Sequence, residues 1–172
     1  MKDFDWTPDG KHVVFVLADE LGRIGDSTLG IKYTLWISRS DGNARVFLAE
    51  NIRSIRISPD GNFIAAIKGS GYVDACYVDQ ELVFLALSPD RASVRQIDLK
   101  TFQFYPSVES DRTFYPLANV TWLSDQAALA GFHVTCEPGK SPAGGYLINP
   151  HLGMMVRFTD QLVSSIEDFE KE

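Results

Sequence analysis

The sequence predicts an all-β protein built from about three copies of one four-stranded antiparallel repeat. A turn motif, Pro-Asp-Gly between two apolar segments, occurs at Pro8–Gly10 and again at Pro59–Gly61, and a degenerate copy follows at Ser124–Gln126. Short apolar runs bounded by turn residues recur along the chain, and helical periodicity is nearly absent. These observations favour strands joined by tight turns throughout.

Each copy of the motif is predicted to form a tight hairpin. Proline presets φ at the first turn position, aspartate accepts hydrogen bonds from the backbone two residues on, and glycine adopts a positive φ at little cost. The runs that follow the first two turns, His12–Ala18 and Phe63–Lys68, are apolar on both faces of the strand. This pattern indicates burial on both sides, as for a strand in a sheet stacked between two others.

A second pair of strands is expected to complete each repeat after a long connection. The predicted pairs are Tyr33–Arg39 with Ala44–Leu48, Val94–Leu99 with Thr101–Phe104, and Gly145–Asn149 with Met154–Phe158. Their turns are Ser40–Asn43, Lys100 and Pro150–Gly153. We predict a single domain over residues 1–172, with repeats at approximately 4–57, 58–122 and 123–169. The copies are spaced more widely than compact blades of about 40 to 50 residues, so inserted connections are expected.

The motifs support a family resemblance. Trp-Thr-Pro-Asp-Gly-Lys at 6–11, Ile-Ser-Pro-Asp-Gly-Asn at 57–62 and Leu-Trp-Ile-Ser-Arg-Ser-Asp-Gly at 35–42 resemble the repeats of TolB-like β-propellers. Related repeats occur in the propellers of prolyl-oligopeptidase-type enzymes. The resemblance covers nearly the whole chain and weakens in the third copy, where the proline and glycine of the turn are lost. It implies a β-propeller of four-stranded antiparallel blades, and it does not specify a function.

Composition and charge exclude several classes of function. The chain is 45% hydrophobic and 23% charged, as in ordinary soluble globular proteins. Its net charge is −7 and it has no basic stripe, so we expect no nucleic-acid partner. No apolar run approaches the roughly 18 residues that span a bilayer, and the N-terminus lacks the apolar segment of a signal peptide. We therefore expect no membrane insertion, and either a cytoplasmic protein or a piece of a longer one.

Catalytic and metal motifs are weak. His133 and Cys136 are close in sequence and Cys76 lies in the corresponding connection of the preceding repeat, but a tetrahedral site needs four ligands, or three and a water. Cys76 and Cys136 could form one disulfide, although two reduced thiols are favoured. The Gly-Lys-Ser at Gly139–Ser141 lacks the upstream glycine of a phosphate-binding loop, and no Gly-x-Ser-x-Gly nucleophile motif occurs. We expect no metal, no cofactor and no enzymatic activity.

The long connections are the candidate binding region. In a four-stranded antiparallel repeat, both tight turns lie on one side of the sheet and the long connections lie on the other. The long connections are Asp19–Lys32, Gly69–Glu81, Tyr105–Pro116 and His133–Gly144. Their aromatic and charged residues suit protein interfaces, which favour Tyr and Arg. The candidate binding residues are Arg23, Tyr72, Tyr77, Arg112, Tyr115, His133 and Lys140.

Two functional hypotheses follow. The first is a non-enzymatic scaffold that binds a protein or peptide through the long connections. The second is a propeller fragment or subunit that gates substrate for a hydrolase or peptidase domain outside this chain. For the individual residues the alternative is that the aromatic side chains pack the connections onto the sheets and that the charges are solvated.

The number of repeats also raises the question of ring closure. Propellers use about four to eight blades, whereas about three repeats are visible here. Phe4–Trp6 and Ser165–Phe169 occupy the same place in the repeat, so two copies joined head to tail would give about six blades, the number that the resemblance implies. We therefore expect a homo-oligomer that completes a ring. A truncated longer chain and an open array capped by the acidic tail are the alternatives.

Overall fold

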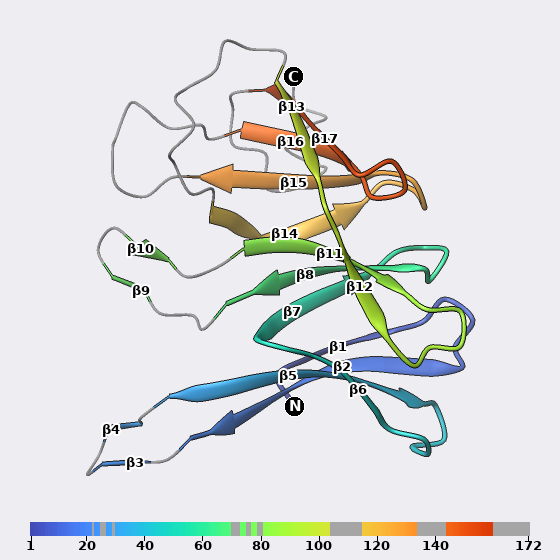
Figure 1. Cartoon of the computed structure of the whole chain (residues 1–172), viewed down its shortest axis with the longest axis vertical. Helices are drawn as coiled ribbons and strands as arrows, with labels where there is room; N and C mark the ends of the chain where they lie inside the picture. Colours follow the sequence, from blue (N-terminus) through green and yellow to red (C-terminus); the bar gives the residue numbers. More distant parts are fainter. Residues whose placement is uncertain are drawn as a thin grey trace.

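A computed structural model describes residues 1–21, 23–24, 27–28, 30–69, 73–74, 77–78, 81–103, 115–133 and 144–159. All secondary-structure elements in these residues are β-strands. The strands form three sheets of four or five strands, stacked along the longest axis of the molecule (Figure 1). The predicted all-β fold is confirmed.

In each sheet four consecutive strands form a meander in which neighbouring strands are antiparallel. The first sheet has the order β1-β2-β5-β6, with bounds Asp3–Trp6, His12–Glu20, Ile31–Arg39 and Val46–Glu50. The second has the order β7-β8-β11-β12, with bounds Ile52–Ile57, Phe63–Lys68, Glu81–Leu87 and Val94–Ile97. The third begins β14-β15-β16-β17, with bounds Tyr115–Trp122, Ala128–His133, Gly144–Asn149 and Met154–Thr159. Each sheet thus has the strand arrangement of a propeller blade.

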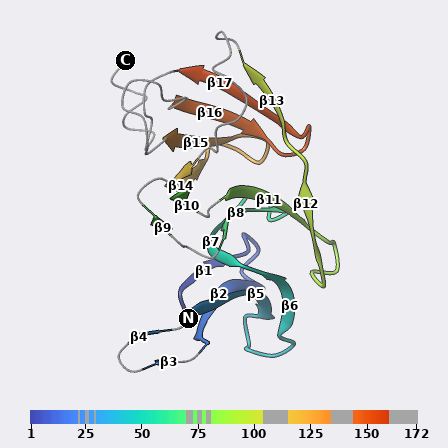
Figure 2. The same cartoon turned by 60° about the vertical axis from the view of Figure 1, so that its left-hand side comes forward.

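The third sheet carries a fifth strand. β13 (Lys100–Gln103) pairs in parallel with β17 at the outer edge of this sheet, from Lys100 opposite Met154 to Gln103 opposite Arg157. Figure 2 shows β12 and β13 following each other along the outer edges of the second and third sheets. The strand that follows the second sheet in sequence therefore pairs with the outer strand of the third sheet.

The strand prediction for the second repeat was wrong. The third and fourth strands of this sheet are β11 and β12, not Val94–Leu99 and Thr101–Phe104. β11 is buried over most of its length because it is a central strand, and it ends at a further copy of the turn motif, Ser88-Pro89-Asp90-Arg91. Arg91 takes the glycine position with φ of 60°. The missing glycine concealed this turn in the sequence.

The long connections are shorter than predicted. β2 and β5 extend into the predicted connection, where Asp19 pairs with Lys32. Within the remainder, β3 (Arg23–Ile24) pairs with β4 (Ser27–Thr28), and in the second repeat β9 (Val73–Asp74) pairs with β10 (Tyr77–Val78). Backbone pairing continues past the sheet in both repeats because a hairpin satisfies the amides that an irregular loop would leave to solvent.

The second sheet is buried on both faces. Along β8, Ile64 and Ala66 pack against the first sheet, whereas Ala65 and Ile67 pack against the third. The first cluster adds residues such as Val14, Val16, Leu35 and Ile37, and the second adds Ala128, Ala130, Tyr146 and Ile148. The prediction of two-sided burial is confirmed for Phe63–Lys68. In β2 it holds only at the centre, because none of the described sheets covers the outer face of the first sheet.

The first two copies of the turn motif have equivalent hydrogen bonds. The Thr7 amide donates to His12 O at 3.0 Å, and the Ser58 amide donates to Phe63 O at 2.9 Å. Gly10 and Gly61 have φ of 66° and 73°, a region that glycine adopts at little cost. A Cβ on Gly61 would lie 3.0 Å from Pro8 Cδ, so the two turns also lie against each other.

Ser58 offers a test of this turn. Its side chain is fully buried, donates through Oγ to Asp60 Oδ1, and accepts a hydrogen bond from the Phe63 amide at 2.9 Å. Ser58→Ala leaves that buried amide without its acceptor, so we expect unfolding to become easier by about 1–3 kcal/mol. Chemical denaturation monitored by circular dichroism measures the change.

Ser40→Ala is the matched control, because Ser40 is an exposed residue of another tight turn and its side chain makes no hydrogen bond among the described residues. We expect this variant to stay within about 0.5 kcal/mol of the parent protein. Equal effects of the two substitutions would contradict the structural role assigned to the Ser58 hydroxyl.

Candidate functional site

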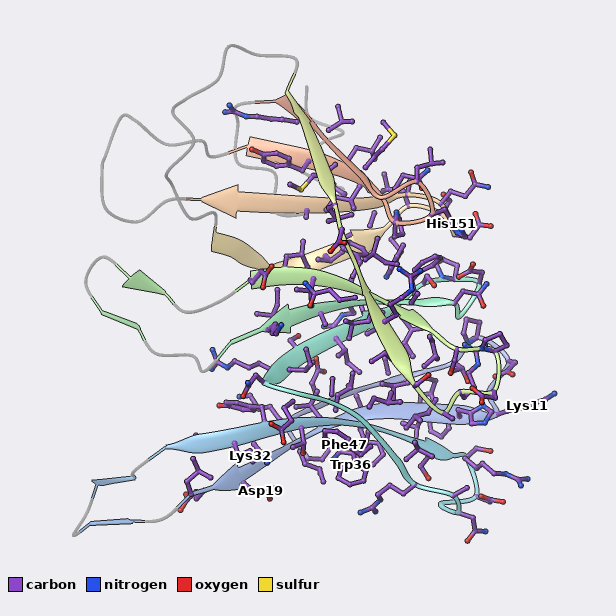
Figure 3. All side chains as sticks on the ribbon, viewed as in Figure 1. Lys11, Asp19, Lys32, Trp36, Phe47 and His151 are labelled. Atoms are coloured by element: carbon purple, nitrogen blue, oxygen red, sulfur yellow. The ribbon has the colours of Figure 1, made fainter. Side chains whose placement is uncertain are left out.

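The molecule has two unlike sides. The tight-turn side consists of the turns at 7–11, 40–43, 58–62, 88–92, 123–127 and 150–153. The long-connection side carries the hairpins β3–β4 and β9–β10, which project away from the tight turns in Figure 1. In Figure 3, Lys11 and His151 mark the tight-turn side, and Asp19 and Lys32 lie toward the other. The predicted assignment of turns and connections to opposite sides is therefore visible in the described residues.

Polar groups on the tight-turn side are largely used within the turns. Asp9 accepts from the Lys11 amide at 3.0 Å, Asp60 from the Asn62 amide at 3.0 Å, and Asp90 from the Ala92 amide at 3.1 Å. Asp41 accepts in the same way from the Asn43 amide at 2.9 Å. These carboxylates hold the turns in shape, and this is a structural role.

Neighbouring turns are also joined to each other. His151, from the β16–β17 turn, lies against the Phe63 ring with centroids 4.5 Å apart. Its Nε2 is 3.2 Å from Asp125 O and 3.8 Å from Asp60 Oδ2, which links the second and third sheets. Arg91 donates through Nη1 to Gly61 O, which joins the two turns of the second sheet. Contacts between turns therefore use many of the polar groups on the tight-turn side.

Four of the seven predicted binding residues lie in described strands. The backbone places Arg23 in β3 and Tyr77 in β10, the two projecting hairpins. It places His133 at the end of β15 and Tyr115 at the start of β14, so Tyr115 lies in a strand and not in the predicted connection. Tyr72, Arg112 and Lys140 lie outside the described residues, as do Cys76 and Cys136.

A surface ion pair joins β5 and β6 on this side of the first sheet. Lys32 Nζ lies 2.8 Å from Glu50 Oε1, and both side chains are about half exposed, so the pair contributes little to stability. The sequence reasoning missed Arg53, on the innermost strand of the second sheet. Its guanidinium lies 5.1 Å from the centroid of the buried Tyr33 ring, and its buried Nε makes no hydrogen bond in the described part of the chain. In the sequence, Arg53 is marked only by its position next to the apolar Ile52.

The described residues offer little to a small molecule. A partly open hollow between the second and third sheets has room for no more than about one water molecule and is lined by residues of β7, β8, β11 and β14 such as Ser54, Ile67 and Val120. Small-molecule pockets usually have 300–1,000 Å³. No group of three or more His, Cys, Asp or Glu residues suited to a metal occurs in the described ranges. No described helix is long and apolar enough to cross a membrane.

Comparison with solved structures identifies the fold. An acylaminoacyl peptidase from Pyrococcus horikoshii is similar with a TM-score of 0.51 and 14% sequence identity, over 84% of this chain and 22% of the peptidase chain. The β-propeller domain of the Trilobed protease from Pyrococcus furiosus, which has an open velcro topology, gives a TM-score of 0.47 and 17% identity over 86% of this chain and 38% of that chain. The chain thus spans well under half the length of either protein. No family model and no curated protein sequence matches the chain.

The fold defines the class of protein. The three sheets are β-propeller blades, and the predicted propeller fold is confirmed. At this level of identity the likeness establishes the fold alone. Function therefore has to be argued from the surfaces that the blades present.

The turn carboxylates predict a pH dependence. Burial raises the pKa of Asp60, but hydrogen bonds from Ser58 and Asn62 and the nearby His151 outweigh burial and hold the pKa below its ordinary value. A carboxyl whose folded pKa is lowered stabilises the fold above its unfolded pKa of about 3.9, and this contribution is lost as the pH falls through the folded value. We expect Asp60→Asn to reduce the loss of stability between about pH 5 and pH 3.

Urea unfolding midpoints at a series of pH values measure this effect. Asn62→Ala removes the 2.8 Å hydrogen bond from Asn62 Nδ2 to Asp60 Oδ2 while keeping the carboxyl, so its pH dependence should fall between those of the parent and Asp60→Asn. The parent and Asp60→Asn variants would share one pH profile if Asp60 played no part.

Proposed function

We propose that this chain is a non-enzymatic binding scaffold of TolB-like blades that holds a protein or peptide on its long-connection side. The observation that carries the proposal is the unequal construction of the two sides. The tight turns use their polar groups internally, whereas the opposite side projects β3–β4 and β9–β10 beyond the sheets (Figure 1). Projecting segments on a rigid scaffold are the usual carriers of recognition.

The chemistry of these segments fits a polypeptide partner. Tyr72 and Tyr77 can supply rigid aromatic contacts, and Arg23 can supply charge-assisted hydrogen bonds to carboxylates or carbonyls. Strand pairing within each hairpin orders the backbone of Arg23 and Tyr77 before a partner binds, so less backbone conformational entropy is lost on binding. The net charge of −7 disfavours a polyanionic partner.

Substitutions on the two sides test the proposal. Peptides selected from a displayed random library against the folded chain serve as the probe, and calorimetry measures their affinity. We expect Tyr72→Ala, Tyr77→Ala and Arg112→Ala each to weaken binding by at least about fivefold, as interface anchors do, with the fold unchanged.

Lys11→Ala and Asn62→Ala, on the tight-turn side, are the controls and should leave the affinity unchanged. If Lys11→Ala or Asn62→Ala lowered the affinity more than the three test substitutions, the binding surface would lie on the tight-turn side and the proposal would be contradicted.

A second function is supported by a different observation. The chain matches a peptidase structure over 22% of that chain, so these blades can also be part of a propeller that gates substrate for a hydrolase or peptidase domain. Detection of the native protein with an antibody against this segment distinguishes the two. A polypeptide much larger than 19.2 kDa that reacts with a serine-hydrolase probe supports gating. A polypeptide of that mass that binds no such probe supports the scaffold.

A further inference from the structure

The outer face of the first sheet carries a continuous aromatic row. Phe4, Phe15, Trp36 and Phe47 are paired across β1, β2, β5 and β6, so their side chains lie on the same face. This face points away from the second sheet, because Val14, Leu35 and Ile37 on the opposite face make the contacts there. Trp36 and Phe47 lie on this outer side of the sheet in Figure 3, with ring centroids 5.4 Å apart.

This face is incompletely covered. Phe4, Trp6 and Phe47 are 49%, 48% and 45% exposed, which is unusual for aromatic residues so close together. Arg45 lies over the Phe15 ring, 5.5 Å from its centroid, and shields only the centre of the row. The face is therefore an apolar surface without a partner among the described residues.

The strand registers show what kind of surface it is. Trp6, Ile57 and Trp122 are the last residues of β1, β7 and β14, and each pairs with the second strand of its own sheet. Ile57 faces the first sheet and Trp122 faces the second, so this position faces the preceding sheet wherever one is present. The outer face of the first sheet is the same surface, and none of the described sheets lies against it.

The same registers identify the residue that meets this position. In each preceding sheet it lies on the third strand: Ile37 lies in the cluster with Ile57, and the Phe84 ring contacts the Trp122 ring in a T-shape with centroids 5.7 Å apart. Ile37 pairs with Val14 and Phe84 with Ala65, and the equivalent pair in the third sheet is Leu147 with Leu129.

Leu147 completes the pattern. Its neighbours Tyr146 and Ile148 pack on the second sheet, so Leu147 points to the far face of the third sheet, where it is 40% exposed. Trp6 and Leu147 are thus the two halves of a sheet-to-sheet contact that the chain makes twice internally, and they lie at opposite ends of the array.

We propose that a second copy of this chain docks on the outer face of the first sheet, with its Leu147 against Trp6. The Trp122 Nε1 donates to Arg56 O of the preceding sheet at 3.2 Å, and by equivalence Trp6 Nε1 donates to the carbonyl of Thr121 of the second copy. Trp6 Nε1 has no hydrogen-bond acceptor in the described part of this chain. The contact is heterologous, and two copies would form a ring of about six blades.

Sedimentation equilibrium of the purified chain tests the proposal. We expect a species of twice the 19.2 kDa chain mass, and Trp6→Glu and Leu147→Glu should each weaken association by at least about tenfold. Leu152→Glu is the control, because Leu152 is 68% exposed in a tight turn and should leave association unchanged. Trp6→Ala and Leu147→Ala should give smaller losses, and they replace the charged variants if either fails to fold by circular dichroism.

A mixing experiment separates this contact from others. Each charged variant keeps one unaltered face, so an equimolar mixture of Trp6→Glu and Leu147→Glu should recover a heterodimer through one contact. A monomeric parent chain, or a mixture that stays monomeric, overturns the proposal. An effect of Trp6→Glu without one of Leu147→Glu also overturns it and indicates a symmetric contact between two first sheets.

Discussion

Burial of both faces of the second sheet is the constraint on which the rest of the structure depends. In the central strand β8, Ile64 and Ala66 face one neighbouring sheet and Ala65 and Ile67 face the other. Neither face of this sheet is polar, so it is stable only between two other sheets. The small residues at Ala65 and Ala66 let the neighbouring sheets approach closely, and larger residues such as Phe84 fill the remaining space. The apolar side chains between neighbouring sheets are therefore what holds the blades together.

Stacking of this kind determines where recognition can take place. Once both faces of a blade are covered, its outer edge and the ends of its strands remain exposed, and the short turns at one end give little surface. Aspartates from the first sheet reinforce the stack, because Asp3 and Asp5 accept hydrogen bonds from the Ile55 and Ile57 amides of the second, both at 2.9 Å. The other end of the strands is then the part of the blade that can lengthen without disturbing the core.

The sequence predicted the features that depend on local chemistry. Pro-Asp-Gly with an apolar run on each side specifies a hairpin by itself, and two-sided apolar runs specify stacked sheets, so the fold and the two sides of the blades were predictable. The misplaced strands in the second repeat show the limit. Arg91 adopts a positive φ that its residue type does not suggest, because the surrounding Ser88 and Asp90 hydrogen bonds impose it. The contact of Arg53 with Tyr33 depends on how two sheets approach, which spacing along the chain does not reveal.

The parallel strand β13 has a consequence for the order in which the chain acquires its structure during synthesis. The first two sheets pair strands that leave the ribosome one after another, so each can form as soon as its own segment is available. β13 has to wait, because its only strand partner in the described residues, β17, is made about fifty residues later. Until then the outer edge of the second sheet continues into an unpaired segment. Formation of the third blade is therefore the step that gives β13 its partner. A ribosome that pauses before residue 154 holds a nascent chain with two blades and an unpaired β13 segment.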